Sequence, residues 1–241
     1  GEYTLYFARK GYEVSALELA DTNIAAFRKK LTLEDKIDLV QGNALNLSRY
    51  TDKSFDIVLL FGPLYHLKRN AYVKQNVLKD DGKIFFAFIS NDFIFLTELE
   101  HDVNYFSSGD YDKETFKLND FPFVFHTVDA ARNLLANSGI NVLHEVASDG
   151  ASELMASRIN EMSDKDYAQY LRYHFYICEK PELLGMTNHL LFVGEKNDKL
   201  IRQIFVGCTK AERYPINETA AFKTNDSPPS SGFLEDWLGS G

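Results

Sequence analysis

The stretch FDIVLLFGPLYHL (residues 55–67) decides the fold class of this chain. Its first six residues are almost continuously apolar, which is the pattern of a strand buried on both faces of a parallel sheet. The strand runs into Gly62 and Pro63. Glycine lets the backbone approach a ligand closely, and proline stiffens the loop. Tyr65 and His66 follow, so the stretch predicts a buried strand whose carboxyl end carries candidate binding residues.

Segments with helical and strand periodicity alternate on both sides of this stretch. The alternation predicts a doubly wound (Rossmann-like) α/β fold with a mostly parallel sheet. Before it, we expect a helix that is stopped by Gly11, and a helix over 22–31 with Asp21 or Thr22 as its N-cap. The other expected elements are strands over 12–19 and 37–45, a helix over 69–78, a turn over 79–82 and a buried strand over 83–89.

The second half begins with a segment of different character. Residues 91–123 are rich in aromatic and acidic side chains and lack the β/α rhythm, so we interpret them as an inserted lid over the carboxyl edge of the sheet. Further elements are a helix over 126–139 ended by Gly139, a strand over 140–150, a helix over 162–179 with Ser163 as N-cap, and a last strand over 188–196. We therefore expect one domain over 1–196, followed by an unassigned tail or linker over 197–241.

Composition narrows the function classes. The formal net charge is −9, which disfavours nucleic acid and anionic membranes as partners because both require a positive field. Cys178 and Cys208 lie far apart without CxxC spacing, which favours a reducing cytoplasm. The six histidines show neither HxxxH nor HExxH spacing, so we predict no metal. No apolar run is long enough to span a membrane, and the start has no signal-peptide pattern.

Three positions carry candidate chemistry because each follows a predicted strand. Glu18 closes the strand over 12–19, where a carboxylate can accept hydrogen bonds from the two hydroxyls of a ribose; an exposed strand-end acid is the alternative. Asn43 and Ala44 lie in a glycine-containing loop that could contact an adenine edge or be an ordinary connection. His66 could act as a general base or cap the next helix.

The order and spacing of these segments resemble the class I S-adenosylmethionine-dependent methyltransferases, particularly the small-molecule type of bacteria and archaea. The resemblance extends from Gly1 to about Lys196. It rests on GEYTLYFARKGYEVSALEL (1–19), QGNALNLS (41–48), FDIVLLFGPLYHL (55–67), VLKDDGKIFFAFI (77–89), SGINVLHEVASDGAS (138–152) and NHLLFVGEK (188–196). It implies a closing antiparallel hairpin strand, S-adenosylmethionine as cofactor and a small molecule as methyl acceptor.

The resemblance also implies roles for single residues. Those implied to bind the cofactor are Gly1, Glu18, Leu19, Asn43, Ala44, Leu60, Phe61 and Gly62. Tyr65 and His66 would face the acceptor. Methyl transfer from an activated sulfonium needs mainly alignment and the exclusion of water, so no catalytic dyad is expected to stand out.

The chain departs from the family pattern in three places. Gly1 looks like the last glycine of the family's G-x-G-x-G motif, so we expect this sequence to lack the first strand of the fold. The spacing from His66 to Gly82 is shorter than usual. Asn43 stands where the family more often has aspartate.

Candidate contacts to the methyl acceptor lie in the second half of the chain. Tyr173, His174 and His189 belong to a mix of aromatic and polar residues that could line an acceptor pocket, although aromatic residues at helical spacing are more often core. Two other functions share the fold: a nicotinamide-dependent oxidoreductase, and a non-catalytic binding protein.

Overall fold

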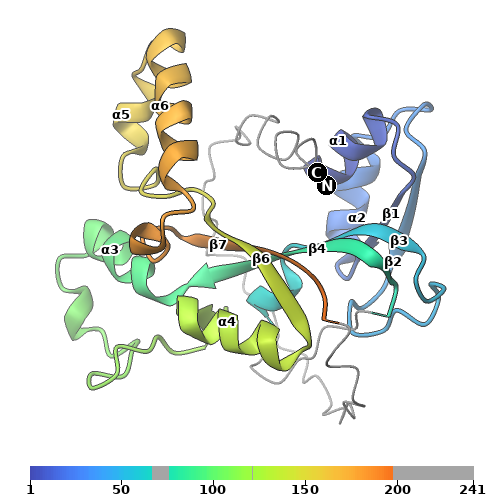
Figure 1. The fold of residues 1–241 in the computed structure, drawn as a ribbon. Helices are drawn as coiled ribbons and strands as arrows, with labels where there is room; N and C mark the ends of the chain where they lie inside the picture. Colours follow the sequence, from blue (N-terminus) through green and yellow to red (C-terminus); the bar gives the residue numbers. More distant parts are fainter. Residues whose placement is uncertain (67–75, 121, 198–241) are drawn as a thin grey trace. The chain divides into compact units, whose positions relative to one another are not determined.

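The computed structural model describes residues 1–66, 76–120 and 122–197 (Figure 1). The described residues divide into two compact units, one formed by Gly1–Asn46 and the other by the residues from Leu47 onward. Each unit has its own sheet, and the two are described separately below. The predicted tail after residue 197 and most of the predicted helix over 69–78 lie outside the described residues.

The first unit has the predicted β/α order. It contains α1 (Glu2–Arg9), β1 (Val14–Glu18), α2 (Asp21–Arg28) and β2 (Ile37–Gln41), and the two strands pair in parallel. Helix α1 ends just before Gly11, as predicted, and Gly11 has a φ of 93°. The predicted N-cap of α2 is wrong. Ala20 occupies this position in extended conformation, because the helix already includes Asp21 and Thr22.

The second unit is built on a mixed sheet with the strand order β3-β4-β7-β6, and β5 also pairs with β4. The strands are β3 (Phe55–Leu60), β4 (Leu78–Ser90), β5 (Phe125–His126), β6 (Ile140–Ala147) and β7 (His189–Lys196). Strands β3 and β5 run parallel to β4, whereas β7 runs antiparallel to both of its neighbours. The structure thus confirms the α/β fold and the closing antiparallel strand.

Two details of this sheet correct the sequence analysis. The predicted turn over 79–82 lies inside β4. There, Phe55 pairs with Leu78 but Ile57 pairs with Lys83, so the intervening residues form a bulge instead of a separate turn. Strand β3 is half-buried along most of its length, not buried on both faces. Within the described residues it is an edge strand with β4 as its neighbour.

The helices of the second unit are α3 (Asn91–His101), α4 (Val128–Asn137), α5 (Ala156–Asn160) and α6 (Asp164–Ile177). Ser163 caps α6 as predicted, because its hydroxyl accepts a hydrogen bond from the Asp166 N–H at 3.2 Å. Gly139 follows α4 with a φ of 72°, also as predicted. Figure 1 shows α5 and α6 side by side as a helical hairpin.

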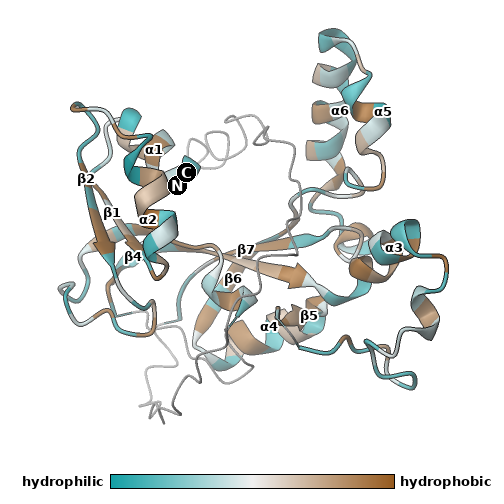
Figure 2. Cartoon of the chain, turned by 180° about the vertical axis from the view of Figure 1, so that it is seen from behind, coloured by the Kyte–Doolittle hydropathy of each residue, from teal (hydrophilic) through white to brown (hydrophobic). Residues whose placement is uncertain are grey.

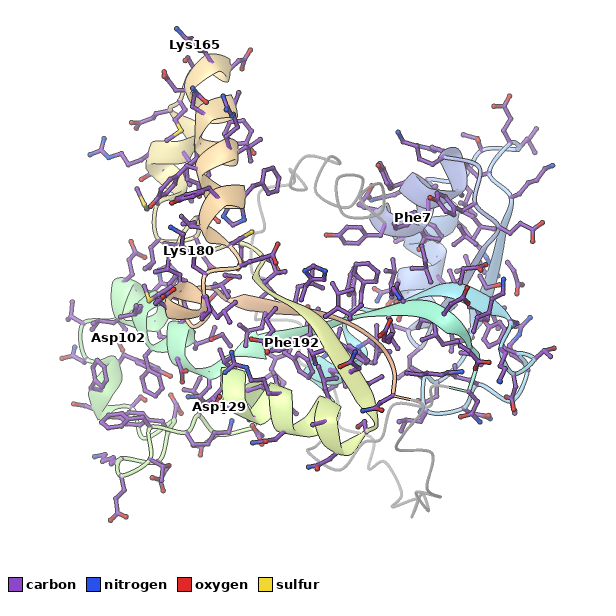
Figure 3. The ribbon with its side chains drawn as sticks, viewed as in Figure 1. Phe7, Asp102, Asp129, Lys165, Lys180 and Phe192 are labelled. Carbon is purple, nitrogen blue, oxygen red and sulfur yellow. The ribbon has the colours of Figure 1, made fainter. Side chains whose placement is uncertain are left out.

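The core of the second unit lies between the sheet and α4. It contains Phe86 and Phe88 of β4, and Ala131 and Leu135 of α4. Phe192 of β7, labelled in Figure 3, belongs to the same cluster. The hydropathy colours show the matching apolar stretches on β6 and β7 (Figure 2). Packing of this kind fixes the strand ends that carry the candidate site.

The segment over 91–123 is more regular than predicted. It starts with helix α3, and Tyr111 and Leu118 form an isolated antiparallel bridge. Phe95, Tyr105, Tyr111 and Leu118 make a separate small apolar cluster. Its role as a lid stays a prediction.

Among the described helices, none has the length and apolar character needed to cross a membrane.

Candidate functional site

In the first unit, the predicted nucleoside-binding residues meet at the carboxyl ends of β1 and β2. Glu18 pairs with Gln41 across the two strands, and the backbone N–H of Gly42 donates to the carbonyl of Glu18 at 2.9 Å. The Gln41 side chain donates to the Leu19 carbonyl at 3.3 Å. The turn after β1 and the loop that carries Asn43 are therefore held together by direct hydrogen bonds.

The Glu18 carboxylate is oriented but not saturated. Its Oε1 accepts a hydrogen bond from the Ala20 N–H at 2.9 Å. In the part of the chain that the structure describes, this N–H is the one donor to the carboxylate, so Oε2 stays available. A half-buried carboxylate with one fixed and one available oxygen suits a pair of vicinal hydroxyl donors. These residues thus fit the ribose of a nucleoside cofactor.

Asn43 has less freedom than the sequence suggests. Its Oδ1 accepts a hydrogen bond from the Leu45 N–H at 2.9 Å, which shapes the loop in which it lies. The amide N–H₂ is therefore the group that it can offer to a base. Nearby, the Leu19 side chain is 65% exposed and presents an apolar surface that a planar base could cover.

Gly1 is the N-cap of α1 and packs closely against another helix of its unit. A Cβ at this position would overlap the ring of Phe27 in α2, so a larger residue here would displace α1 or α2. The position therefore tolerates only a residue without a side chain.

In the second unit, the loop after β3 is held by a buried anchor. Gly62 has a φ of 105°, a conformation that residues with a side chain rarely adopt, and it precedes the 3₁₀ turn Pro63–Tyr65. Leu64 is 2% exposed and belongs to the main core, so it fixes the turn. Phe61 precedes this turn and Tyr65 is its last residue, and both are half-buried.

The two predicted acceptor-facing residues have different neighbours. The ring of Tyr65 lies against the ring of His189, with 5.9 Å between centroids. The ring of His66 instead contacts Phe123 at 5.3 Å, and its Nδ1 is 3.4 Å from the Pro122 carbonyl. The structure therefore brings Tyr65, but not His66, together with the start of β7.

His189 is hydrogen-bonded to an aspartate from a distant loop. Its Nδ1 is 2.7 Å from Oδ2 of Asp149, and its backbone N–H donates to Oδ1 at 3.1 Å. Buried Thr187 secures this loop. Its hydroxyl accepts the N–H groups of Asp149 and Gly150, at 3.2 and 3.0 Å, and donates to the Asp149 carboxylate. The carboxylate is thus held by side-chain and backbone groups from the start of β7.

The pKa values of this pair move in opposite directions. Burial opposes the charged form of His189, but the hydrogen bond and the charge of Asp149 outweigh it and raise the pKa of His189. Burial likewise acts to raise the pKa of Asp149, yet hydrogen bonds from His189 and Thr187 bring that pKa below its ordinary value. Burial and the charge of Asp149 raise the pKa of nearby Glu153.

The predicted acceptor residues of α6 are not both at the surface. Tyr173 is 57% exposed. His174 is 9% exposed, and its Nε2–H donates to the Ser148 carbonyl at 3.0 Å. Burial lowers the pKa of His174. Of the three predicted acceptor residues, only His189 lies beside Tyr65, while His174 supports the loop that carries Asp149.

The sequence analysis missed Asp149 and Thr187. A signal was present in two short polar strings. SDG (148–150) directly follows β6, and TNH (187–189) leads into β7, so both lie at the same edge of the sheet. As for metals, no cluster of three or more His, Cys, Asp or Glu side chains suited to hold an ion occurs in the described ranges.

Comparisons with known proteins identify one family profile and several structures of similar fold. Residues 1–86 match the profile of a family described as "Methyltransferase domain". A comparison with curated proteins finds no significant match.

Solved structures share the fold at low identity. The PH0226 protein from Pyrococcus horikoshii OT3 is 17% identical with a TM-score of 0.50, and the alignment covers 81% of this chain and 77% of that one. A SAM-dependent methyltransferase from Archaeoglobus fulgidus is 13% identical with a TM-score of 0.50, and the alignment covers 81% of each chain. The family match favours a methyltransferase over the nicotinamide-dependent alternative.

Proposed function

We propose that this protein is a class I S-adenosylmethionine-dependent methyltransferase and that it transfers a methyl group to a small-molecule acceptor. Its fold and the family match of residues 1–86 support the proposal. The observation that carries the proposal is the Glu18 carboxylate, oriented by Ala20 and available at Oε2, beside the loop that carries Asn43. The carboxylate can bind the ribose hydroxyls of a nucleoside, and the neighbouring loop can contact its base.

The resemblance to methyltransferases assigns cofactor-binding roles to residues of each unit, and these roles stay proposals. In the first unit, Glu18 would bind the ribose hydroxyls. Leu19, Asn43 and Ala44 would contact the adenine, with Gly1 toward the methionine end. In the second unit, the contacts to the methionine end would come from Leu60, Phe61 and Gly62, at and after the end of β3.

The acceptor residues are proposed from the second unit. Tyr65 and His189 lie together at the edge of the sheet, and Asp149 and Glu153 make their surroundings acidic. Together with the net charge of −9, this disfavours a polyanion such as RNA as acceptor. Exposed His66 and Tyr173 stay proposed acceptor contacts, and we assign a supporting role to buried His174. The cytoplasmic location stays a prediction from the sequence.

The cofactor supplies an electrophilic methyl group on a positively charged sulfur. The residues of this chain would therefore act mainly by holding the acceptor in line and by excluding water. Tyr65 suits this task because the buried anchor Leu64 fixes its turn.

The test is a transfer assay with S-adenosylmethionine labelled in the methyl group. The purified protein is offered separate pools of small phenols, amines and thiols, and in parallel total RNA and denatured protein. We expect label in a small molecule, strongly reduced by Glu18→Gln and unchanged by Glu13→Gln, since Glu13 is an exposed acid just before β1. Label in RNA or protein alone would contradict the proposed acceptor class.

A further inference from the structure

We propose that His189 is the general base of the transfer, that Asp149 is its positioning residue, and that the acceptor is a neutral aromatic compound with an acidic hydroxyl group. This inference rests on the function proposed above and adds to it a proton acceptor and a substrate class. It is carried by the juxtaposition of an exposed imidazole, a fixed carboxylate and a tyrosine ring at one sheet edge.

The hydrogen bonds of the pair leave one nitrogen of His189 available. Nδ1 lies 2.7 Å from Oδ2 of Asp149, so the Nδ1–H donates to the carboxylate. In the neutral ring, Nε2 then carries the lone pair. The side chain of His189 is 46% exposed and that of Asp149 is 29% exposed. The imidazole can therefore contact a ligand while the hydrogen bond to the less exposed carboxylate fixes its orientation. A less exposed acid that orients a more exposed histidine is the arrangement used by known general bases.

The other histidines in the described residues lack this combination. His66 contacts the ring of Phe123 and a backbone carbonyl, and buried His126 lies against the ring of Phe88. His144 pairs with Glu179 at 3.2 Å, but both side chains are exposed, and Nε2 of His174 bonds to a backbone carbonyl in the interior. His101 pairs with its neighbour Glu100, and both are exposed. His189 therefore differs from them in having both a well-held acid and an adjacent aromatic ring.

The groups around His189 indicate which acceptors fit. Asp149 is bonded to it, Glu153 acts on it through its negative charge, and the Tyr65 ring lies beside it. Glu98 and His101 in turn act on Glu153. Two carboxylates near the base repel an anionic acceptor such as a carboxylate or a phosphate. The Tyr65 ring offers a surface on which a planar aromatic acceptor can pack.

The chemistry balances without a further reactant. The acceptor oxygen forms a bond to the methyl carbon as the bond from that carbon to sulfur breaks, and the hydroxyl proton passes to Nε2 of His189. The charge of the resulting imidazolium is offset by Asp149. A phenol has a pKa of about 10, and Asp149 shifts the pKa of His189 upward, toward that of the phenol. General-base help typically contributes about 10²–10⁴-fold.

The first test measures the base without requiring turnover. The imidazole of His189 in the full chain is titrated by NMR, in the wild type and in Asp149→Asn. We expect the titration midpoint of His189 to fall in Asp149→Asn and to stay unchanged in Glu179→Gln, which alters only the His144 pair. An equal midpoint in the wild type and Asp149→Asn would overturn the role of Asp149.

The second test measures transfer to three probes that share a benzene ring and differ in the reacting group: catechol, benzylamine and benzoate. We expect methylation of catechol. His189→Gln should lower kcat by about 10²-fold or more without weakening S-adenosylmethionine binding, and His144→Gln should leave kcat within about twofold. In Asp149→Asn, the rise of kcat with pH should move to lower pH.

The outcomes separate this inference from the proposed function. If His189→Gln keeps its kcat, or if the wild type methylates only benzylamine or benzoate, the base or the substrate class is wrong, although the methyltransferase stands. A folded wild type that binds S-adenosylmethionine but methylates none of the probes also overturns the substrate class. If the wild type does not bind S-adenosylmethionine at all, the proposed function fails, and the NMR titration still decides whether Asp149 tunes His189.

Discussion

Replacing Thr187 by valine should lower the free energy of unfolding by about 2–4 kcal/mol although the shape of the side chain is kept. Thr187 is 0% exposed. Its hydroxyl accepts the N–H groups of Asp149 and Gly150, at 3.2 and 3.0 Å, and donates to the Asp149 carboxylate. Valine can replace none of these interactions.

The magnitude follows from the groups that lose a partner. Gly150 is buried, so its N–H cannot form a hydrogen bond to water instead. Leaving this N–H without an acceptor should cost about 1–3 kcal/mol. The N–H of half-buried Asp149 can be partly hydrated, so the loss of its acceptor should cost less. The Asp149 carboxylate keeps its two hydrogen bonds from His189. Thr187→Ser is the matched control, because it keeps the hydroxyl and loses one methyl group, at a cost of about 1 kcal/mol.

The assay is equilibrium unfolding in urea followed by circular dichroism, with both variants measured beside the wild type. At a typical slope of about 2 kcal/mol per molar urea, Thr187→Val should unfold at a urea concentration about 1–2 M lower than the wild type. If Thr187→Val unfolds at the same concentration as Thr187→Ser, the hydroxyl does not hold the Asp149 loop, and this reasoning is refuted.

Two further predictions concern pH and close packing. Because the pKa of His189 is raised in the folded state, its pair with Asp149 contributes stability that is fully present below the unfolded pKa of about 6.5 and is lost as pH rises through the folded value. The thermal stability of the wild type relative to His189→Gln should therefore shrink as pH rises from about 6 to about 9, and a growing advantage would contradict the pairing. Gly194→Ala should lower stability by about 1–3 kcal/mol, because its Cβ would lie 2.5 Å from Cγ2 of Ile140 and 3.0 Å from the Asn141 carbonyl. Gly185→Ala is the control, since nothing lies within 4 Å of its Cβ, and equal calorimetric midpoints for the two variants would argue against the close packing of β6 and β7.

The sequence predicted those elements whose signals are local. The helix cap at Ser163 involves a bond to a residue three positions along the chain, and the end of α1 at Gly11 is equally local. Apolar runs located β3 and β4, because a run of apolar residues indicates a strand even where, as in β3, the strand is only half-buried.

The errors arose where long-range contacts decide the structure. The bulge at residues 79–82 exists only because β4 pairs with β3, so composition alone suggested a turn. The pairing of Asp149 with His189 spans 40 residues, and the bonds of Thr187 to the same loop span 38. The strings SDG (148–150) and TNH (187–189) mark the two loops, but only the strand register shows that Asp149 lies beside His189.

Calorimetric titration with S-adenosylmethionine and S-adenosylhomocysteine tests the central claim most directly. The account predicts binding with a dissociation constant of about 1 μM, weakened at least about tenfold by Glu18→Ala because charge-assisted hydrogen bonds to the ribose are lost, and unchanged by Glu13→Gln. A folded wild-type protein that binds neither compound would contradict the methyltransferase assignment, and equal binding by Glu18→Ala would contradict the role of Glu18.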